Sequence, residues 1–136
     1  MSNAPLSLMD FVKAAKAQIE EVSPEQLEDM QTNVGNLLIL DVRESGEHEQ
    51  GFIKGAMLVP RGILEAAADM NYPKRQPELV EARNRPVVVY CATGGRSAMA
   101  AATLKLMGFE NVVSLAGGIT RWQQESRSLI REARYV

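Results

Sequence analysis

Two apolar runs, at residues 37–42 and 86–90, constrain the fold of this chain more than any other feature. Leu37-Leu38-Ile39-Leu40-Asp41-Val42 and Pro86-Val87-Val88-Val89-Tyr90 are nearly continuous in apolar residues, without polar–apolar alternation. Strands of this kind are covered on both faces, as in a parallel sheet flanked by helices. Shorter candidate strands lie at residues 18–22, 56–59 and 111–115, and helical segments separate the strands. The pattern predicts an α/β fold with an open, mostly parallel five-stranded sheet and helices on both faces.

Two helix starts are marked by their capping residues. Ser7 followed by Asp10 fits a capping box, and Ser23 followed by Gln26 fits another. Apolar residues then recur on one helical face through residues 8–19. We expect this first helix to cap an edge of the core, with a partner-binding role as the alternative. Further helical segments are expected at residues 44–50, 63–70, 78–84, 97–107 and 119–124.

Composition limits the class of protein. The 136 residues suit one domain, and 46% apolar with 24% charged residues is ordinary for a globular chain. Because 15 basic residues nearly balance 17 acidic ones, nothing predicts binding to nucleic acid or to an anionic membrane. No apolar run approaches the ~20 residues of a membrane span, and no signal-peptide core is present. We expect a cytoplasmic protein with an N-terminal helical extension (1–20), one domain (21–124) and a C-terminal tail (125–136).

The chain contains one cysteine, Cys91, and one histidine, His48. A single cysteine forms no internal disulfide, and one cysteine with one histidine makes no zinc site, so we expect neither metal nor cofactor. His48 lies in a polar stretch and is expected to be a solvated surface residue. A Cys–His dyad is therefore disfavoured.

Cys91 follows the second apolar run directly and precedes a helix, which is where open α/β sheets bind their ligands. The loop that it begins predicts an anion-binding nest: two glycines permit left-handed backbone, the helix start supplies N–H groups, and Arg96 adds a cation. Such surroundings stabilise a thiolate, so we interpret Cys91 as a nucleophile rather than a small buried side chain. Activation by electrostatics alone suits attack on a polarised sulfur or on a phosphate. The loop residues are Cys91, Ala92, Thr93, Gly94, Gly95, Arg96 and Ser97.

Three blocks of sequence, between about residues 21 and 124, resemble one known family. The blocks are Leu38-Ile39-Leu40-Asp41-Val42-Arg43 with Glu47, continued by Gly51-Phe52-Ile53-Lys54-Gly55-Ala56 and Val59-Pro60; Val88-Val89-Tyr90-Cys91 through Arg96-Ser97; and Leu115-Ala116-Gly117-Gly118-Ile119 with Trp122. In this order they resemble the rhodanese-like domain of the thiosulfate sulfurtransferase family, in its single-domain type.

The resemblance implies a sulfurtransferase without a cofactor. Cys91 would carry a sulfane sulfur from thiosulfate or another persulfide donor to a thiol, a protein cysteine or cyanide. The N–H groups of residues 92–97 would surround the terminal sulfur of its persulfide. Supporting roles are implied for Asp41 and Arg43, as an ion pair that holds the loops, and for Gly117, Gly118 and Trp122, which would shape the rim of the site.

Two departures from the family pattern stand out. Phe52 occupies a position where the family often has histidine, and Ala92 one often filled by a larger basic residue. The second departure leaves Arg96 as the expected main anchor for an anion. Phosphatases and arsenate reductases of this fold separate cysteine and arginine by five residues, whereas four separate Cys91 from Arg96. The shorter loop favours sulfur transfer.

The alternative is a non-catalytic module of the same fold that regulates or binds a partner. The first helix and the tail support it, because neither is needed for the core. In the tail, Leu129, Ile130 and Tyr135 are expected to dock back on the domain or to pair with another chain.

Overall fold

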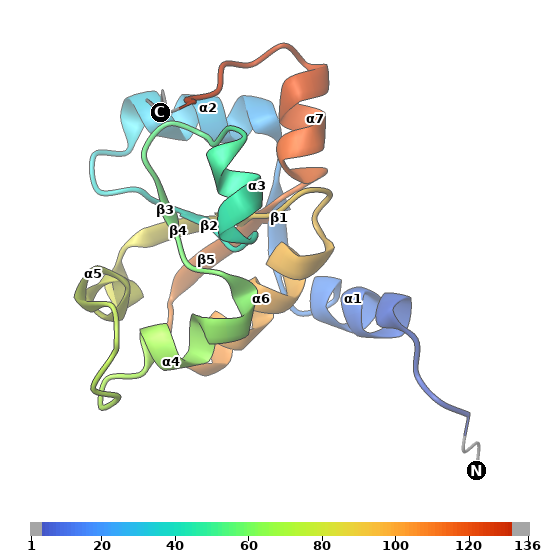
Figure 1. Cartoon of the computed structure of the whole chain (residues 1–136), viewed down its shortest axis with the longest axis vertical. Coiled ribbons are helices and arrows are strands. Elements are labelled where there is room, and N and C mark those ends of the chain that lie inside the picture. Colours follow the sequence, from blue (N-terminus) through green and yellow to red (C-terminus); the bar gives the residue numbers. More distant parts are fainter. Residues whose placement is uncertain (1–3, 132–136) are drawn as a thin grey trace.

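In the computed structural model, residues 4–131 are described, and they contain a five-stranded sheet between two layers of helices (Figure 1). The strand order is β1-β5-β4-β2-β3, and each neighbouring pair is parallel. The predicted α/β fold with its open five-stranded sheet is therefore confirmed. The strands are β1 (Glu20–Val22), β2 (Leu38–Asp41), β3 (Ala56–Leu58), β4 (Pro86–Tyr90) and β5 (Asn111–Leu115).

The two apolar runs form neighbouring strands in the interior of the sheet. In the register of β2 and β4, Asp41 lies opposite Tyr90, so both strands end at the same level. The amide of Val42 donates to the carbonyl of Tyr90 at 3.0 Å and continues the pairing by one residue. Cys91 therefore lies directly beyond the carboxyl edge of the sheet, beside the end of β2.

The helices divide between the two faces of the sheet (Figure 1). Along β4, Val87 and Val89 pack toward one face, while Val88 and Tyr90 pack toward the other. The first face carries α1 (Leu8–Lys16), α4 (Leu64–Ala68), α5 (Pro77–Val80) and α6 (Gly95–Leu106), with the 3₁₀ turns η1 (Arg61–Ile63) and η2 (Glu81–Asn84). The other face carries α2 (Pro24–Asn33), α3 (Ser45–Glu49) and α7 (Gly118–Gln124). No helix within residues 4–131 is long and apolar enough to cross a membrane.

Helix α1 packs across α6 at the edge of this layer. Its capping box forms as predicted, with the Ser7 hydroxyl accepting from the amide of Asp10. The helix ends at Lys16, three residues earlier than the apolar pattern suggests, because the chain turns there into β1. Val12 is buried, and a Cβ placed on Gly95 would meet its Cγ2 atom at 3.4 Å. The first helix therefore reaches the start of α6, next to Cys91.

Helix α6 begins earlier than the composition predicts. Its N-cap is Gly94, whose φ of 110° lies in the left-handed region that glycine adopts readily. The helix starts at Gly95 rather than at residue 97, so the loop after β4 is shorter than expected. As in any helix, the first amides have no partner within the helix, and here they lie next to Cys91.

The described part of the tail returns to the domain. Ile130 pairs with Phe52 in an antiparallel bridge, with N–H···O distances of 2.9 and 2.8 Å. The indole of Trp122 donates to the carbonyl of Ser128 at 2.9 Å. These contacts agree with the expectation that the tail docks back, while Tyr135 lies outside the described residues.

Candidate active site around Cys91

Cys91 lies at the bend between β4 and α6, and its residue surface is 1% exposed. Its side chain lines a pocket of about 270 Å³ together with the start of α6, including Thr93, Gly95 and Arg96. Helix α1 forms the opposite wall. The sulfur is thus shielded from bulk water but adjoins a small cavity.

The amides at the start of α6 point at the sulfur. The Sγ atom of Cys91 accepts from the amide of Gly94 at 3.1 Å and from that of Ser97 at 3.4 Å. The thiol also donates to the Ser97 hydroxyl at 3.4 Å, which in turn bonds Ser114 at 2.8 Å. Amides that converge at a helix start favour negative charge on the group that they face. The geometry therefore suits a thiolate, or a persulfide that extends from it.

The start of α7 holds the other side of the loop. The amides of Ile119 and Thr120 donate to the carbonyls of Cys91 and Ala92, each at 3.0 Å. Gly117 and Gly118, with φ of 74° and 59°, turn the chain sharply enough for α7 to begin there. The glycine pair thus fixes the backbone of the loop.

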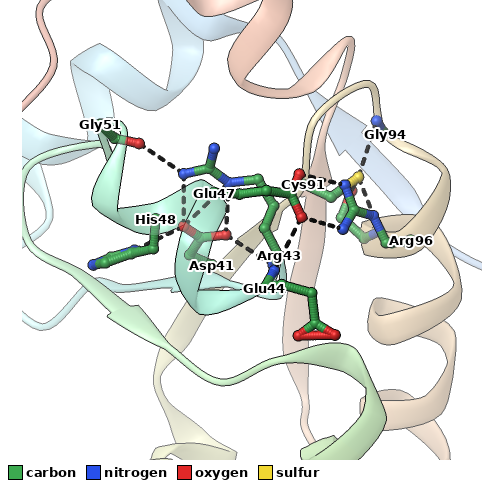
Figure 2. A network of polar contacts seen from close by, with 10 residues as sticks. Asp41, Arg43, Glu44, Glu47, His48, Gly51, Cys91, Gly94 and Arg96 are labelled. Carbon is green, nitrogen blue, oxygen red and sulfur yellow. Dashed lines mark hydrogen bonds and ion pairs between the residues drawn. The ribbon is translucent and has the colours of Figure 1, made fainter.

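Asp41 is the centre of a buried polar network beside this loop (Figure 2). Its carboxylate accepts from Arg43 Nε at 3.0 Å and Nη2 at 2.9 Å. It also contacts His48 Nδ1 at 2.8 Å and the Tyr90 hydroxyl at 3.1 Å. Arg43 donates further to the carbonyl of Gly51 at 2.8 Å. The network joins the segment after β2 to Tyr90, the last residue of β4 and the neighbour of Cys91 in the chain.

Burial and the ion pair set the ionisation of this network. Burial raises the pKa of Tyr90, with the nearby Asp41 charge adding to the effect. Burial opposes ionisation of Arg43, but hydrogen bonding and the charge of Asp41 outweigh it and raise the pKa of the guanidinium. The phenol therefore stays protonated near neutral pH, where it donates to Asp41 and accepts from the amide of Ile53 at 3.2 Å.

The expectation that His48 is a solvated surface residue is wrong. Its side chain is 18% exposed, its ring stacks on Phe52 at 4.2 Å, and Nδ1 bonds Asp41. The polar composition of residues 47–50 gave no sign of this arrangement. The signal lay at Asp41, because a carboxylate at the end of a buried strand needs several hydrogen-bond donors. Because the ring is directed to Asp41, it forms no dyad with Cys91.

Arg96, the expected main anchor for an anion, is paired with a carboxylate in this structure. Its guanidinium meets the carboxylate of Glu47 in two hydrogen bonds, of 2.8 and 2.9 Å. The Arg96 hydrogen bond lowers the pKa of Glu47 to about 2, and the same contact raises the pKa of Arg96. In Figure 2, Glu47 reaches from α3 toward Arg96 near Cys91. Sequence reasoning noted Glu47 only as part of a motif and missed this contact.

The remaining sequence-predicted residue, Trp122 of α7, lies in the same core cluster as Leu27 of α2, with 2% of its surface exposed. Its indole nitrogen bonds the tail rather than the Cys91 loop. Within residues 4–131, no group of three or more His, Cys, Asp or Glu side chains is arranged to hold a metal ion.

Known proteins share both the sequence pattern and the fold. "Probable adenylyltransferase/sulfurtransferase MoeZ" of Mycobacterium tuberculosis (strain CDC 1551 / Oshkosh) is 33% identical over 116 residues, which are 85% of this chain and 27% of that protein. The "Sulfurtransferase" of Allochromatium vinosum is 30% identical over 112 residues, 82% of this chain and 95% of that protein. The chain thus spans about a quarter of the first relative and nearly all of the second.

Solved structures agree with the sequence comparison. The Rhodopseudomonas palustris "Protein of Unknown Function RPA3614, Possible Tyrosine Phosphatase" superposes with a TM-score of 0.87 at 27% identity and covers 96% of this chain and 98% of its own. The polysulfide-sulfur transferase homodimer of Wolinella succinogenes gives a TM-score of 0.69 at 28% identity, over 91% of this chain and 87% of its own. The family model of the Rhodanese-like domain matches residues 23–125. The chain therefore belongs to the rhodanese-like family, whose members include proteins named sulfurtransferases.

Proposed function

We propose that this protein is a sulfurtransferase in which Cys91 carries a sulfane sulfur as a persulfide. The observation that carries the proposal is the Cys91 sulfur itself, which adjoins a small cavity and accepts two backbone N–H groups from the start of α6. Those amides favour an anionic sulfur before transfer and would stabilise the terminal sulfur of the persulfide after it.

The loading step is a nucleophilic displacement at sulfur. The Cys91 thiolate attacks the outer sulfur of the donor, so that an S–S bond forms to Sγ. The bond between donor sulfur and leaving group breaks, and its electron pair leaves with sulfite when the donor is thiosulfate, or with a thiolate when the donor is a persulfide. No external oxidant or reductant is consumed.

The unloading step needs an acceptor from outside these residues. The 136 residues contain no second cysteine, so the persulfide has no internal thiol to meet. A small thiol, a protein cysteine or cyanide attacks the terminal sulfur and regenerates the Cys91 thiolate. Donor and acceptor react in turn at one sulfur, which predicts ping-pong kinetics.

Mass spectrometry of the intact protein tests the proposal. After incubation with a panel of sulfane donors, the protein is expected to gain one sulfur atom, which an external thiol then removes. Cys91→Ser is expected to gain none while it retains the same circular dichroism spectrum. Absence of an adduct with every donor would refute sulfur transfer and favour the non-catalytic, partner-binding module.

A phosphatase reaction is the competing chemistry. The Rhodopseudomonas palustris relative is named a possible tyrosine phosphatase. In this chain, however, four residues separate Cys91 from Arg96, rather than the five of phosphatases of this fold. Arg96 is also paired with Glu47, which partly offsets the positive charge that a phosphate would meet. Hydrolysis of an aryl phosphate that depends on Cys91, without any sulfur loading, would support the phosphatase instead.

A further inference from the structure

The pocket next to Cys91 has an apolar wall that the first helix supplies. Leu8, Met9 and Val12 of α1 line it, and Met99 of α6 adds a fourth apolar side chain. At about 270 Å³ the pocket lies just below the usual range of about 300–1,000 Å³ for small-molecule sites. It therefore suits a small occupant with apolar surface.

This wall lies outside the part of the chain that the family model matches. That match covers residues 23–125, whereas α1 spans Leu8–Lys16. Leu8 and Met9 are 68% and 66% exposed, so an occupant of the pocket would cover apolar surface that now faces water. Covering such surface stabilises a complex in proportion to the area removed from water.

The charges around the pocket would stabilise a bound dianion only weakly. Arg96 lines the pocket, but both of its terminal nitrogens are engaged by Glu47 at 2.8 and 2.9 Å. Lys16 is the second cation in the lining, and its ammonium lies 4.0 Å from the carboxylate of Glu21. The pocket thus presents one loosely paired cation beside its apolar wall.

We propose that the preferred donor is an organic sulfane compound, with an apolar group beside the reacting sulfur and at most one negative charge, and that thiosulfate is a poorer donor. This inference rests on the proposed function. With an aryl thiosulfonate, the Cys91 thiolate attacks the outer sulfur, an S–S bond forms to Sγ, and the sulfur–sulfur bond of the donor breaks. Its electron pair leaves on the sulfinate, so charge and atoms balance without an added oxidant.

Benzenethiosulfonate and thiosulfate make a matched pair of donors, because a phenyl group in one replaces a charged oxygen in the other. The measurement is kcat/KM for each donor with the same thiol acceptor. The double variant Leu8→Gln/Met9→Gln changes the exposed wall and keeps helix-forming side chains. Phe11→Gln is the control, since Phe11 is an exposed apolar residue of the same helix that is not part of the pocket lining.

The ratio of kcat/KM for benzenethiosulfonate to that for thiosulfate is expected to fall about fivefold or more in the double variant. In Phe11→Gln it is expected to change by less than about twofold. Because the ratio in each variant is compared with the ratio in the wild type, the intrinsic difference in reactivity between the two donors cancels. An equal ratio in the wild type and the folded double variant overturns the inference, as does a wild type that thiosulfate loads and benzenethiosulfonate does not. Failure of every sulfane donor of the panel, these two included, to load Cys91 refutes the proposed function instead.

Discussion

Gly118 lies directly against the backbone of Cys91: a Cβ atom placed on it would be 2.6 Å from the Cys91 carbonyl oxygen. The same atom would also meet the carbonyl group of Ala92. Those two carbonyls accept the first amides of α7, so neither is able to move away without loss of a hydrogen bond. Glycine is therefore required at position 118 for two reasons: the loop backbone lies too close for a Cβ atom, and the φ of 59° is left-handed.

Gly118→Ala is expected to destabilise the fold by more than about 3 kcal/mol, because left-handed strain of about 1–3 kcal/mol adds to a clash with fixed backbone. Gly55 is the matched control: its φ is 85°, but a Cβ there meets nothing within 4 Å. Gly55→Ala should lose only about 1 kcal/mol from strain. Urea unfolding measures both. Equal losses would show that the contact of Gly118 with the loop contributes nothing.

Asp41→Asn is expected to destabilise the protein by about 3–5 kcal/mol, because it leaves the Arg43 guanidinium buried without its anionic partner. Asp29→Asn is the control, since Asp29 is exposed and accepts from the side chain of its helical neighbour Asn33. Its effect should stay within about 0.5 kcal/mol. Urea unfolding again provides the measurement, and a small loss in Asp41→Asn would mean that the network is not a stabilising unit.

The sheet and the helix starts could be predicted because they depend on local sequence. Apolar runs identify buried strands wherever these lie, and the capping boxes at Ser7 and Ser23 form from residues three positions apart. For α6, the composition predicts a start two residues later than the structure shows, since it does not reveal that Gly94 adopts the left-handed conformation. A cap of that kind depends on backbone geometry, which the residue type permits but does not impose.

The polar contacts of the site could not be predicted in the same way. Glu47 and Arg96 are 49 residues apart, as are Asp41 and Tyr90. Their meeting depends on the pairing of β2 with β4 and on the exit direction of each following segment. Sequence reasoning identified Cys91 and its loop as a candidate from local pattern, but the partners of Arg96 and His48 emerge only once the strands are placed.

The Glu47–Arg96 pair is expected to make the free energy of unfolding depend on pH in the acid range. The pKa of Glu47 is lowered from 4.5 to about 2, so its ionised form is favoured by folding. The stabilisation is therefore complete above pH 4.5 and is lost as the pH falls toward about 2. Because both side chains are partly exposed, the total should not exceed about 1 kcal/mol. Urea midpoints of the wild type and Glu47→Gln should converge over this range; a difference independent of pH would contradict the assignment.

Glu47→Gln should also change the choice of donor, because it removes the negative charge that neutralises Arg96 beside the pocket. We expect kcat/KM for thiosulfate to rise about two- to fivefold relative to benzenethiosulfonate, as suits a partly exposed charge. Added salt should reduce the gain, since it screens the released guanidinium. Glu65→Gln is the control: it breaks the Arg61–Glu65 pair of 2.8 Å, whose residues are not part of the pocket lining, and should leave the ratio unchanged. An unaltered ratio in Glu47→Gln would show that pairing of Arg96 does not limit the use of dianionic donors.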